Sequence, residues 1–250
     1  MNRYIKNLAI KYMPDIVFAQ VYSRINNRNI KIERDHNGWR IIGDKYTVIS
    51  PTAKFTAVSM AEFEDKFEKY FKIKKGDKCL DVGACIGDTT LPMCIKTGIF
   101  GIVYAVEPNK VNFKYLTINT EYRESTKLLE MAVWKEKGEL ILHEHNTPTG
   151  HSLISWSLRK KETIVKTDTL DNLFKNEIID FAKIDVQHAE IEVLGSADKF
   201  LKSTRKLIVE CHHDYKKELH DTSKEVESIL SGYYSNLEYS DKYNLFYAWR

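Results

Sequence analysis

Residues 80–90 read Leu-Asp-Val-Gly-Ala-Cys-Ile-Gly-Asp-Thr-Thr, and this stretch decides the fold class. It continues an apolar run that starts at Cys79 and is typical of a buried strand, and a helical segment to about Lys96 follows it. Gly83 permits a tight turn, and Gly87 lets the helix begin close against the sheet or a ligand. The stretch therefore predicts a strand, a loop and a helix whose N-terminus offers free N–H groups.

The same rhythm of short apolar run, polar turn and helical segment continues along the chain and indicates βαβ units on a parallel sheet. The expected strands are 79–82, 102–106, 128–133, 139–143, 163–166, 181–186 and 207–211, followed by a hairpin of 233–239 and 243–249. The expected helices after the first are 108–122, with proline at its first position, then 168–174, about 191–201 and 215–230. The pattern predicts an α/β protein with a doubly wound sheet.

Residues 1–73 have a different character, so we expect an N-terminal extension there and a nucleotide-type α/β domain over residues 74–250. The extension should contain an amphipathic helix within its first 25 residues, strands at 29–34, 39–42 and 46–49, and a helix at 61–71. Its first helix could pack on its own domain or on a second copy, or lie at a membrane surface. We expect the extension to cap the substrate or to supply contacts of a homodimer.

Charge and composition disfavour several classes. The chain has 38 basic and 35 acidic side chains, and this near balance disfavours a nucleic-acid partner, which would need a basic stripe. No apolar run approaches the ~18 residues of a membrane span, and the N-terminal residues do not resemble a signal peptide. The four cysteines form no C-x-x-C motif and fit a reducing compartment, so we expect a cytoplasmic protein.

A second acid points to a nucleoside ligand. Glu107 ends the run 102–106 and lies 20 residues after Gly87, where a doubly wound fold presents a carboxylate to ribose hydroxyls. Such a carboxylate would repel a 2′-phosphate. Asp81 adds a negative charge that is awkward for a pyrophosphate but suits a ligand with an ammonium and a sulfonium. These charges, and the lack of a G-x-G-x-x-G spacing, favour S-adenosylmethionine (SAM) over the NAD of an oxidoreductase.

Four segments carry a resemblance to a known family. They are residues 80–90, Val103-Tyr-Ala-Val-Glu-Pro-Asn, Lys166-Thr-Asp-Thr-Leu-Asp and Ala182-Lys-Ile-Asp-Val-Gln-His-Ala-Glu-Ile-Glu-Val-Leu. In this order they resemble the FkbM family of SAM-dependent methyltransferases over roughly residues 76–215. The resemblance implies a Rossmann-like class I fold whose seven-stranded sheet has an antiparallel last strand. It also implies O-methylation of a hydroxyl on a sugar, a glycan or another small metabolite.

The resemblance assigns roles to particular positions. The cofactor-binding residues that it implies are Asp81, Gly83, Ala84 and Gly87 in the SAM loop, Glu107 at the ribose, Met131 near the adenine, and Asp185 beside the methyl-transfer site. Two departures stand out. Cys85 stands where the family usually has asparagine, and Gln187-His188 replaces its usual acid–glycine pair on the substrate side. The second departure leaves open a SAM-binding protein without catalysis.

Methyl transfer from a sulfonium is an in-line displacement, so the protein must align the acceptor and remove its proton. The candidates at the ends of neighbouring parallel strands are Asp185, His188, Glu210, His212 and His213. Alternation places Glu210 and His212 on one side and Cys211 on the other. We predict His212, with a carboxylate behind it, as a general base that titrates near neutrality. No strong metal motif is present, although Asp185, Glu210 and His212 could instead hold a divalent cation that acidifies the acceptor hydroxyl.

Overall fold

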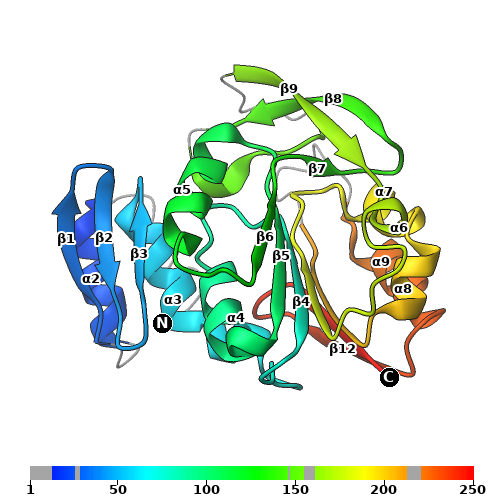
Figure 1. The fold of residues 1–250 in the computed structure, drawn as a ribbon. Helices are drawn as coiled ribbons and strands as arrows, with labels where there is room; N and C mark the ends of the chain where they lie inside the picture. The colour runs from blue at the N-terminus through cyan, green and yellow to red at the C-terminus, as the bar shows by residue number, and fades with distance from the viewer. Residues whose placement is uncertain (1–12, 26–28, 146, 155–160, 213–220) are drawn as a thin grey trace.

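The structure is a computed structural model that describes residues 13–25, 29–145, 147–154, 161–212 and 221–250 (Figure 1). Within these residues the strands form one seven-stranded sheet and two three-stranded sheets. No helix in these ranges is both long enough and apolar enough to cross a bilayer. The predicted His213 and residues 215–220 of the predicted helix 215–230 lie outside the described residues, and the remainder of that helix corresponds to α9 (Ser223–Ser231).

The central sheet has the strand order β12-β13-β11-β10-β4-β5-β6. Its strands are β4 (Lys78–Val82), β5 (Ile102–Val106), β6 (Thr126–Leu129), β10 (Phe181–Ile184), β11 (Lys206–Glu210), β12 (Asn236–Ser240) and β13 (Leu245–Trp249). The strands from β11 to β6 are parallel, and β13 runs antiparallel to both of its neighbours. The order reverses between β4 and β10, and open α/β sheets bind ligands beyond the carboxyl ends at such a point. The predicted fold class, with its antiparallel last strand, is confirmed.

Helices cover both faces of this sheet (Figure 1). One face carries α3 (Ala53–Phe67), α4 (Thr90–Thr97) and α5 (Lys110–Thr120), and the other carries α6 (Leu170–Leu173), α7 (Glu190–Gly195), α8 (Asp198–Ser203) and α9 (Ser223–Ser231). Alternation along the strands supplies apolar side chains to both layers. On β10, Phe181 packs in a cluster with Phe63 and Phe67 of α3, whereas Ile184 packs in a cluster with Val193 of α7.

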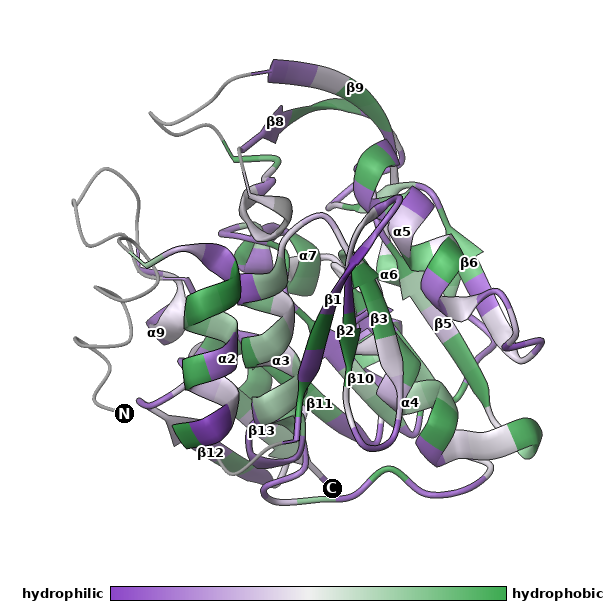
Figure 2. Cartoon of the chain, turned by 90° about the vertical axis from the view of Figure 1, so that its left-hand side faces the viewer, coloured by the Kyte–Doolittle hydropathy of each residue, from purple (hydrophilic) through white to green (hydrophobic). Residues whose placement is uncertain are grey.

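The N-terminal region forms a helix and a small antiparallel sheet beside this sandwich. Its elements are α2 (Asp15–Ile25), β1 (Lys31–Asp35), β2 (Gly38–Ile42) and β3 (Thr47–Ser50). Figure 2 shows α2 and α3 side by side, and Phe18 and Tyr22 pack there against Ala61. The predicted helix 61–71 is displaced: α3 begins at Ala53 because small side chains at 53 and 57 pack against α2, and it ends at Phe67. The division at residue 73 stays a prediction.

A third sheet lies across the carboxyl ends of the central strands (Figure 1). It consists of β7 (Ala132–Val133), β8 (Gly138–Glu144) and β9 (Lys161–Asp168), in the order β7-β9-β8. The predicted single strand 128–133 is therefore wrong. The chain leaves the central sheet after Leu129 and joins β9 at Ala132, so its two halves belong to different sheets.

Two helix predictions also need correction. The helix expected from Pro108 begins at Lys110, because the side chain of Asn109 caps it by accepting from the N–H groups of Val111 and Asn112. The helix expected over 191–201 is two helices, α7 and α8, with a break at Ser196 and Ala197. Both corrections concern short local breaks and leave the layers unchanged.

Candidate active site

Asp81 ties the end of β4 to the start of α4. Its carboxylate is fully buried, and Oδ2 accepts hydrogen bonds from the hydroxyls of Thr89 at 2.6 Å and Thr90 at 2.7 Å. Its Oδ1 lies 3.3 Å from the ammonium of Lys183. The acid predicted beside the cofactor loop is therefore held by the chain itself, and it fixes the shape of that loop.

The loop glycines are required by close approaches. Gly83 has φ +77°, and a Cβ there would lie 1.9 Å from the carbonyl oxygen of Asp185, so the loop touches the end of β10. Gly87 has φ +86°, and a Cβ would lie 2.9 Å from Cδ1 of Leu116 on α5. Ala84 between them is buried against the same leucine. The sequence thus allows the loop to run close to the end of β10 and to α5.

Glu107 is held against this loop by backbone donors. Its Oε2 accepts from the N–H of Cys85 at 2.9 Å and its Oε1 from the N–H of Asn109 at 2.8 Å. Burial raises the pKa of Glu107 to about 8, and the N–H donors offset this only in part. Met131 and Gly83 line a cavity of about 50 Å³ at this end of the sheet. The structure therefore brings the predicted loop, ribose acid and adenine-side residue together.

Lys183 joins the two acids of the site and was missed by the sequence analysis. Its side chain is 4% exposed, and its ammonium lies 3.3 Å from Asp81 and 3.3 Å from Asp185. Burial alone would lower the pKa of Lys183, but Asp81, Asp185 and Glu210 raise it above its ordinary value. A lysine inside the apolar run 181–184 was the available signal, because a charge in a buried strand needs a partner.

Asp185 lies directly after β10 and stays ionised. Its Oδ1 accepts from the amide nitrogen of Gln187 at 3.0 Å. Burial alone would raise the pKa of Asp185, but the charges of Lys183, His212 and Lys66 lower it to about 2. This carboxylate is therefore suited to bind a cation or a hydroxyl and poorly suited to carry a proton at neutral pH.

His212 has its carboxylate, but from a different residue than expected. Its Nδ1 lies 2.9 Å from Oε1 of Glu190, a completely buried residue that also accepts from Thr222. Glu210 instead binds the ammonium of Lys66 at 2.7 Å. The carboxylate behind His212 thus comes from α7, and Glu210, the last residue of β11, is paired with α3.

The protonation of His212 is coupled to Gln187. The amide nitrogen of Gln187 lies 2.7 Å from Nε2 of His212, an arrangement that suits a neutral ring donating from Nδ1 to Glu190. Burial also favours the neutral ring, but Glu190 and Asp185 raise the pKa of His212 to about 9. A protonated ring needs the amide to turn, which would bring its oxygen towards Asp185. The predicted titration near neutrality is therefore shifted upward.

The residues of the candidate site lie within a segment that matches a known family. Residues 81–240 match the family model described as the methyltransferase FkbM domain. The chain belongs to the FkbM methyltransferase family. It is thus a member of a family with a SAM-dependent methyltransferase fold, and α2, α3 and the first small sheet lie outside the FkbM match.

Solved structures with similar chain paths are SAM-dependent methyltransferases of low sequence identity. A SAM-dependent methyltransferase from Aquifex aeolicus is 16% identical with a TM-score of 0.44, over 80% of this chain and 97% of that one. Aeropyrum pernix fibrillarin with natively bound SAM is 11% identical with a TM-score of 0.47, over 88% and 99%. A SAM-dependent O-methyltransferase from Thermotoga maritima is 14% identical with a TM-score of 0.41, over 88% and 77%. No curated protein matches the chain by sequence.

The departure from the FkbM pattern has a structural signature. Gln187 and His188 have φ values of 53° and 75°, in the left-handed region that glycine adopts without strain. The His188 ring lies 5.4 Å from the ring of His212, and the hydroxyl of Ser152, which is bridged to His143 of β8, donates to the carbonyl of Gln187. The two departing residues therefore lie between the FkbM strand ends and the sheet that covers them.

The alternative of a divalent cation has no geometric support among the described residues. There, no three His, Cys, Asp or Glu side chains are grouped closely enough to share a metal. Ammonium groups already compensate two of the three proposed ligands, with Lys183 on Asp185 and Lys66 on Glu210. Nε2 of His212 lies 3.6 Å from Oδ1 of Asp185.

Proposed function

We propose that this chain transfers the methyl group of SAM to a hydroxyl on a sugar, a glycan or another small metabolite. The observation that carries the proposal is the convergence of two strand-end acids on one glycine loop. Glu107, after β5, accepts from the loop N–H of Cys85. The backbone of Asp185, after β10, lies so close to Gly83 that only glycine fits. The loop after β4 is thus flanked by a carboxylate on each side.

The residues of this convergence fit SAM. The buried carboxylate of Glu107 would accept hydrogen bonds from the two ribose hydroxyls, and Met131 would lie against the adenine. The loop at Gly83 and Ala84 offers close backbone approach, and the ionised Asp185 would attract the positive charge of the ligand. When bound, SAM supplies an electrophilic methyl group; everything else in the reaction falls to the chain.

In this proposal the amide of Gln187 turns away when the acceptor binds, and His212 then takes the proton of the acceptor hydroxyl at Nε2. Glu190 holds the ring through Nδ1 and stabilises the charge that develops on it. The raised pKa of about 9 means that the reactive neutral ring grows in population as the pH rises. Asp185, with a pKa of about 2, orients the acceptor instead of accepting its proton. In this proposal Glu210 and His188 are the remaining side chains that line the acceptor side.

We place this activity in the cytoplasm. The four cysteines all lie in the described part of the chain and form no disulfide, and three of them are buried, as expected for a reducing compartment. The N-terminal extension takes part in acceptor binding in this proposal, because its Lys66 reaches Glu210. A homodimer formed through the extension is the other role that we propose for it. The near balance of charges supports a small acceptor over a nucleic acid.

Two measurements test the proposal. Isothermal titration with SAM and with NAD should give saturable binding of SAM only, and tighter binding of NAD would contradict the cofactor. Transfer of a labelled methyl group from SAM to a panel of sugars, glycans and lipid extracts should yield a labelled product. The label should survive mild base if the product is an ether, whereas a methyl ester would release it.

The second candidate is a SAM-binding protein without catalysis. The specific observation in its favour is the strained pair Gln187-His188, where the family usually has an acid and a glycine. Saturable SAM binding with no transfer to any acceptor in the panel would favour this candidate. Recovery of transfer in a variant with Gln187→Glu and His188→Gly would then assign the loss to this pair.

A further inference from the structure

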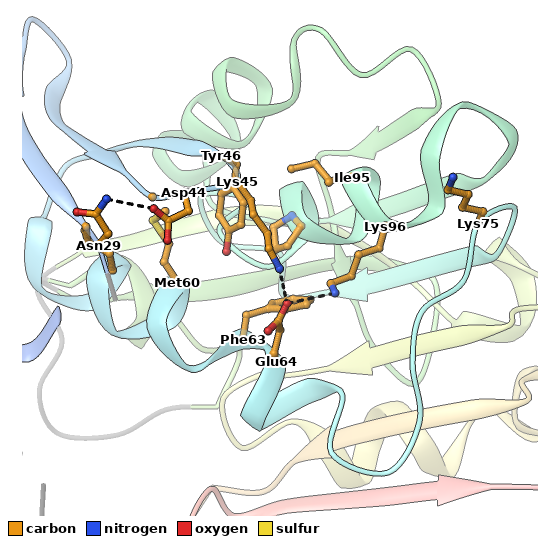
Figure 3. A pocket seen from close by; sticks show the side chains of 13 residues that line it. Asn29, Asp44, Lys45, Tyr46, Met60, Phe63, Glu64, Lys75, Ile95 and Lys96 are labelled. Atoms are coloured by element: carbon orange, nitrogen blue, oxygen red, sulfur yellow. Dashed lines mark hydrogen bonds and ion pairs between the residues drawn. The ribbon is translucent and has the colours of Figure 1, made fainter. Parts of the chain in front are cut away.

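A second cavity, of about 340 Å³, lies away from the candidate active site (Figure 3). The turn between β2 and β3, the middle of α3 and the second half of α4 surround it, and Lys75 lies at one end. Ligand pockets in proteins begin at roughly 300 Å³ and are mostly apolar with a few polar groups at defined places. This cavity meets both criteria, and none of its lining residues belongs to the cofactor loop or the acceptor side.

The interior of the cavity is apolar. Phe63, which is buried, forms part of its wall together with Met60 of the same helix and Ile95 of α4. Tyr46 adds a second ring from the β2–β3 turn. Figure 3 shows these side chains gathered between the two helices and the turn. An acyl chain or an aromatic ring would remove this apolar surface from water, at roughly 25 cal/mol for each Å² buried.

Three lysines and two carboxylates, Asp44 and Glu64, line the rim, and Asp44 accepts a hydrogen bond from the amide of Asn29 at 3.2 Å. Lys45 and Lys96 share the carboxylate of Glu64, at 2.8 Å and 3.6 Å, and Lys96 also binds Glu68 outside the cavity at 2.9 Å. Among the residues that the structure describes, none forms an ion pair with Lys75. Its ammonium thus stands exposed beside an apolar cavity with no carboxylate to compensate it.

We propose that this cavity binds a small amphipathic anion, with its apolar part against Phe63 and Met60 and its negative group at Lys75. A neutral ligand would leave the charge of Lys75 without a partner, and a cation placed beside Lys75 would be repelled by it. The site is separate from the active site but connected to it, since α4 lines the cavity through Ile95 and Lys96 and begins at Thr90, which binds Asp81. A ligand in the cavity would therefore contact the same helix that shapes the cofactor loop.

Methionine methyl signals distinguish this site from the active site. The chain has five methionines; Met60 lines this cavity and Met131 lines the one at the cofactor loop. With methyl-¹³C methionine, sodium octanoate should shift the Met60 signal in a saturable way and leave Met131 in place. SAM should shift Met131. Loss of a signal in Met60→Leu assigns it. Octanoate that shifts Met131 instead of Met60, or shifts neither, overturns the proposal.

The charge preference is tested with matched ligands and matched variants. Octanoate should bind more tightly than octan-1-ol, and octylammonium should bind weakest. Lys75→Glu should weaken octanoate about 5-fold and leave octan-1-ol unchanged, as expected for one exposed charge interaction of up to ~1 kcal/mol. The control is Lys74→Glu, which changes the net charge equally on a neighbour that does not line the cavity. Equal binding of the acid and the alcohol, or equal effects of the two substitutions, would rule out the anion site.

Discussion

The two sides of the candidate site hold their carboxylates by different means. On the cofactor side, Glu107 is bound by backbone N–H groups of Cys85 and Asn109. On the acceptor side, Asp185 is bound by side chains, the ammonium of Lys183 and the amide of Gln187. Backbone donors carry partial charges, whereas an ammonium carries a full one. The pKa of Glu107 is accordingly raised to about 8 by burial, and charges lower the pKa of Asp185 to about 2 although it too is enclosed.

This difference has a functional meaning. The pKa of Glu107 lies close to neutral pH, so its charge, and with it its affinity for ribose hydroxyls, changes with pH. Asp185 stays ionised and presents a constant negative charge to the acceptor side. Asp185 depends on Lys183 for this charge state. The ammonium of Lys183 lies between the carboxylates of Asp185 and Asp81. The following substitutions test this contrast.

The largest effect is expected from Lys183→Met. Removing the ammonium leaves the buried carboxylate of Asp81 and the partly exposed one of Asp185 without their common partner. Breaking a buried ion pair from one side costs about 3–5 kcal/mol. Urea unfolding followed by circular dichroism should show a loss of this size in the free energy of unfolding.

A matched control separates this effect from the mere loss of a lysine. Lys78→Met breaks the pair of Lys78 with Glu177, whose side chains are each about 30% exposed, and should cost less than about 1 kcal/mol. Similar losses for the two variants would mean that Lys183 is no more important than a surface lysine. The contrast between the two sides of the site would then fail.

The next effect is on turnover. His212→Ala should lower turnover about 100-fold or more, as for the loss of a positioned general base, while SAM affinity changes less than about 2-fold. Because its pKa is raised to about 9, wild-type turnover should rise with pH between 7 and 9, and the variant should lose this slope. The measurement is labelled-methyl transfer at saturating SAM across that range. Wild-type turnover in the variant would remove His212 as the base.

The same contrast explains what the sequence could predict. The cofactor side depends on neighbours in sequence and on glycine positions, so Gly83, Gly87 and Glu107 could be assigned from spacing and family resemblance. The acceptor side depends on side chains from elements far apart in the chain. Lys66 comes from α3 and Glu190 from α7, and no local pattern shows that these reach Glu210 and His212.

Errors in the fold have a similar origin. The predicted strand 128–133 divides between two sheets because β7 pairs with a strand some 35 residues later, which periodicity cannot show. The start of α3 was missed because alanines at 53, 57 and 61 pack against α2 without a strong hydrophobic signal. In contrast, the successive strands at 29–34 and 39–42 and the order of βαβ units follow from local residues and were predicted correctly.

A smaller effect is expected at the cofactor side. The ionised carboxylate of Glu107 is the better acceptor for two ribose hydroxyls, so SAM affinity of the wild type should rise about 10-fold from pH 7 to 9 as the group titrates near 8. Glu107→Gln should remove most of this dependence and bind about as weakly as the wild type at pH 7. Titration calorimetry of the wild type and of Glu107→Gln at the same pH values gives the contribution of Glu107 to SAM affinity as the difference between them.

The titration of Glu107 also has a stability counterpart whose sign can be checked. The folded state keeps a proton that the unfolded chain releases near its ordinary pKa, so the contribution of Glu107 is fully present at low pH and is lost as the pH rises through 8. Urea unfolding at pH 6 and pH 9 should show a larger loss in the wild type than in Glu107→Gln, in which only the loss from the raised pKa of His212 remains. A wild type whose SAM affinity and stability are both flat in pH contradicts the assignment.

The smallest change in stability is expected at the strained pair of the acceptor side. His188→Gly relieves a left-handed backbone at φ 75° and removes a ring beside His212, so the free energy of unfolding should change by about 1 kcal/mol or less, in the stabilising direction. Cys85→Gly makes the equivalent change at φ 51° on the cofactor side and serves as the control. If the strain at His188 serves acceptor binding, only the first variant raises the KM for the acceptor, and both leave SAM affinity unchanged. A KM unchanged in both variants would show that the left-handed histidine has no part in acceptor binding. The packing around His188 would then be the only cause of its strained backbone.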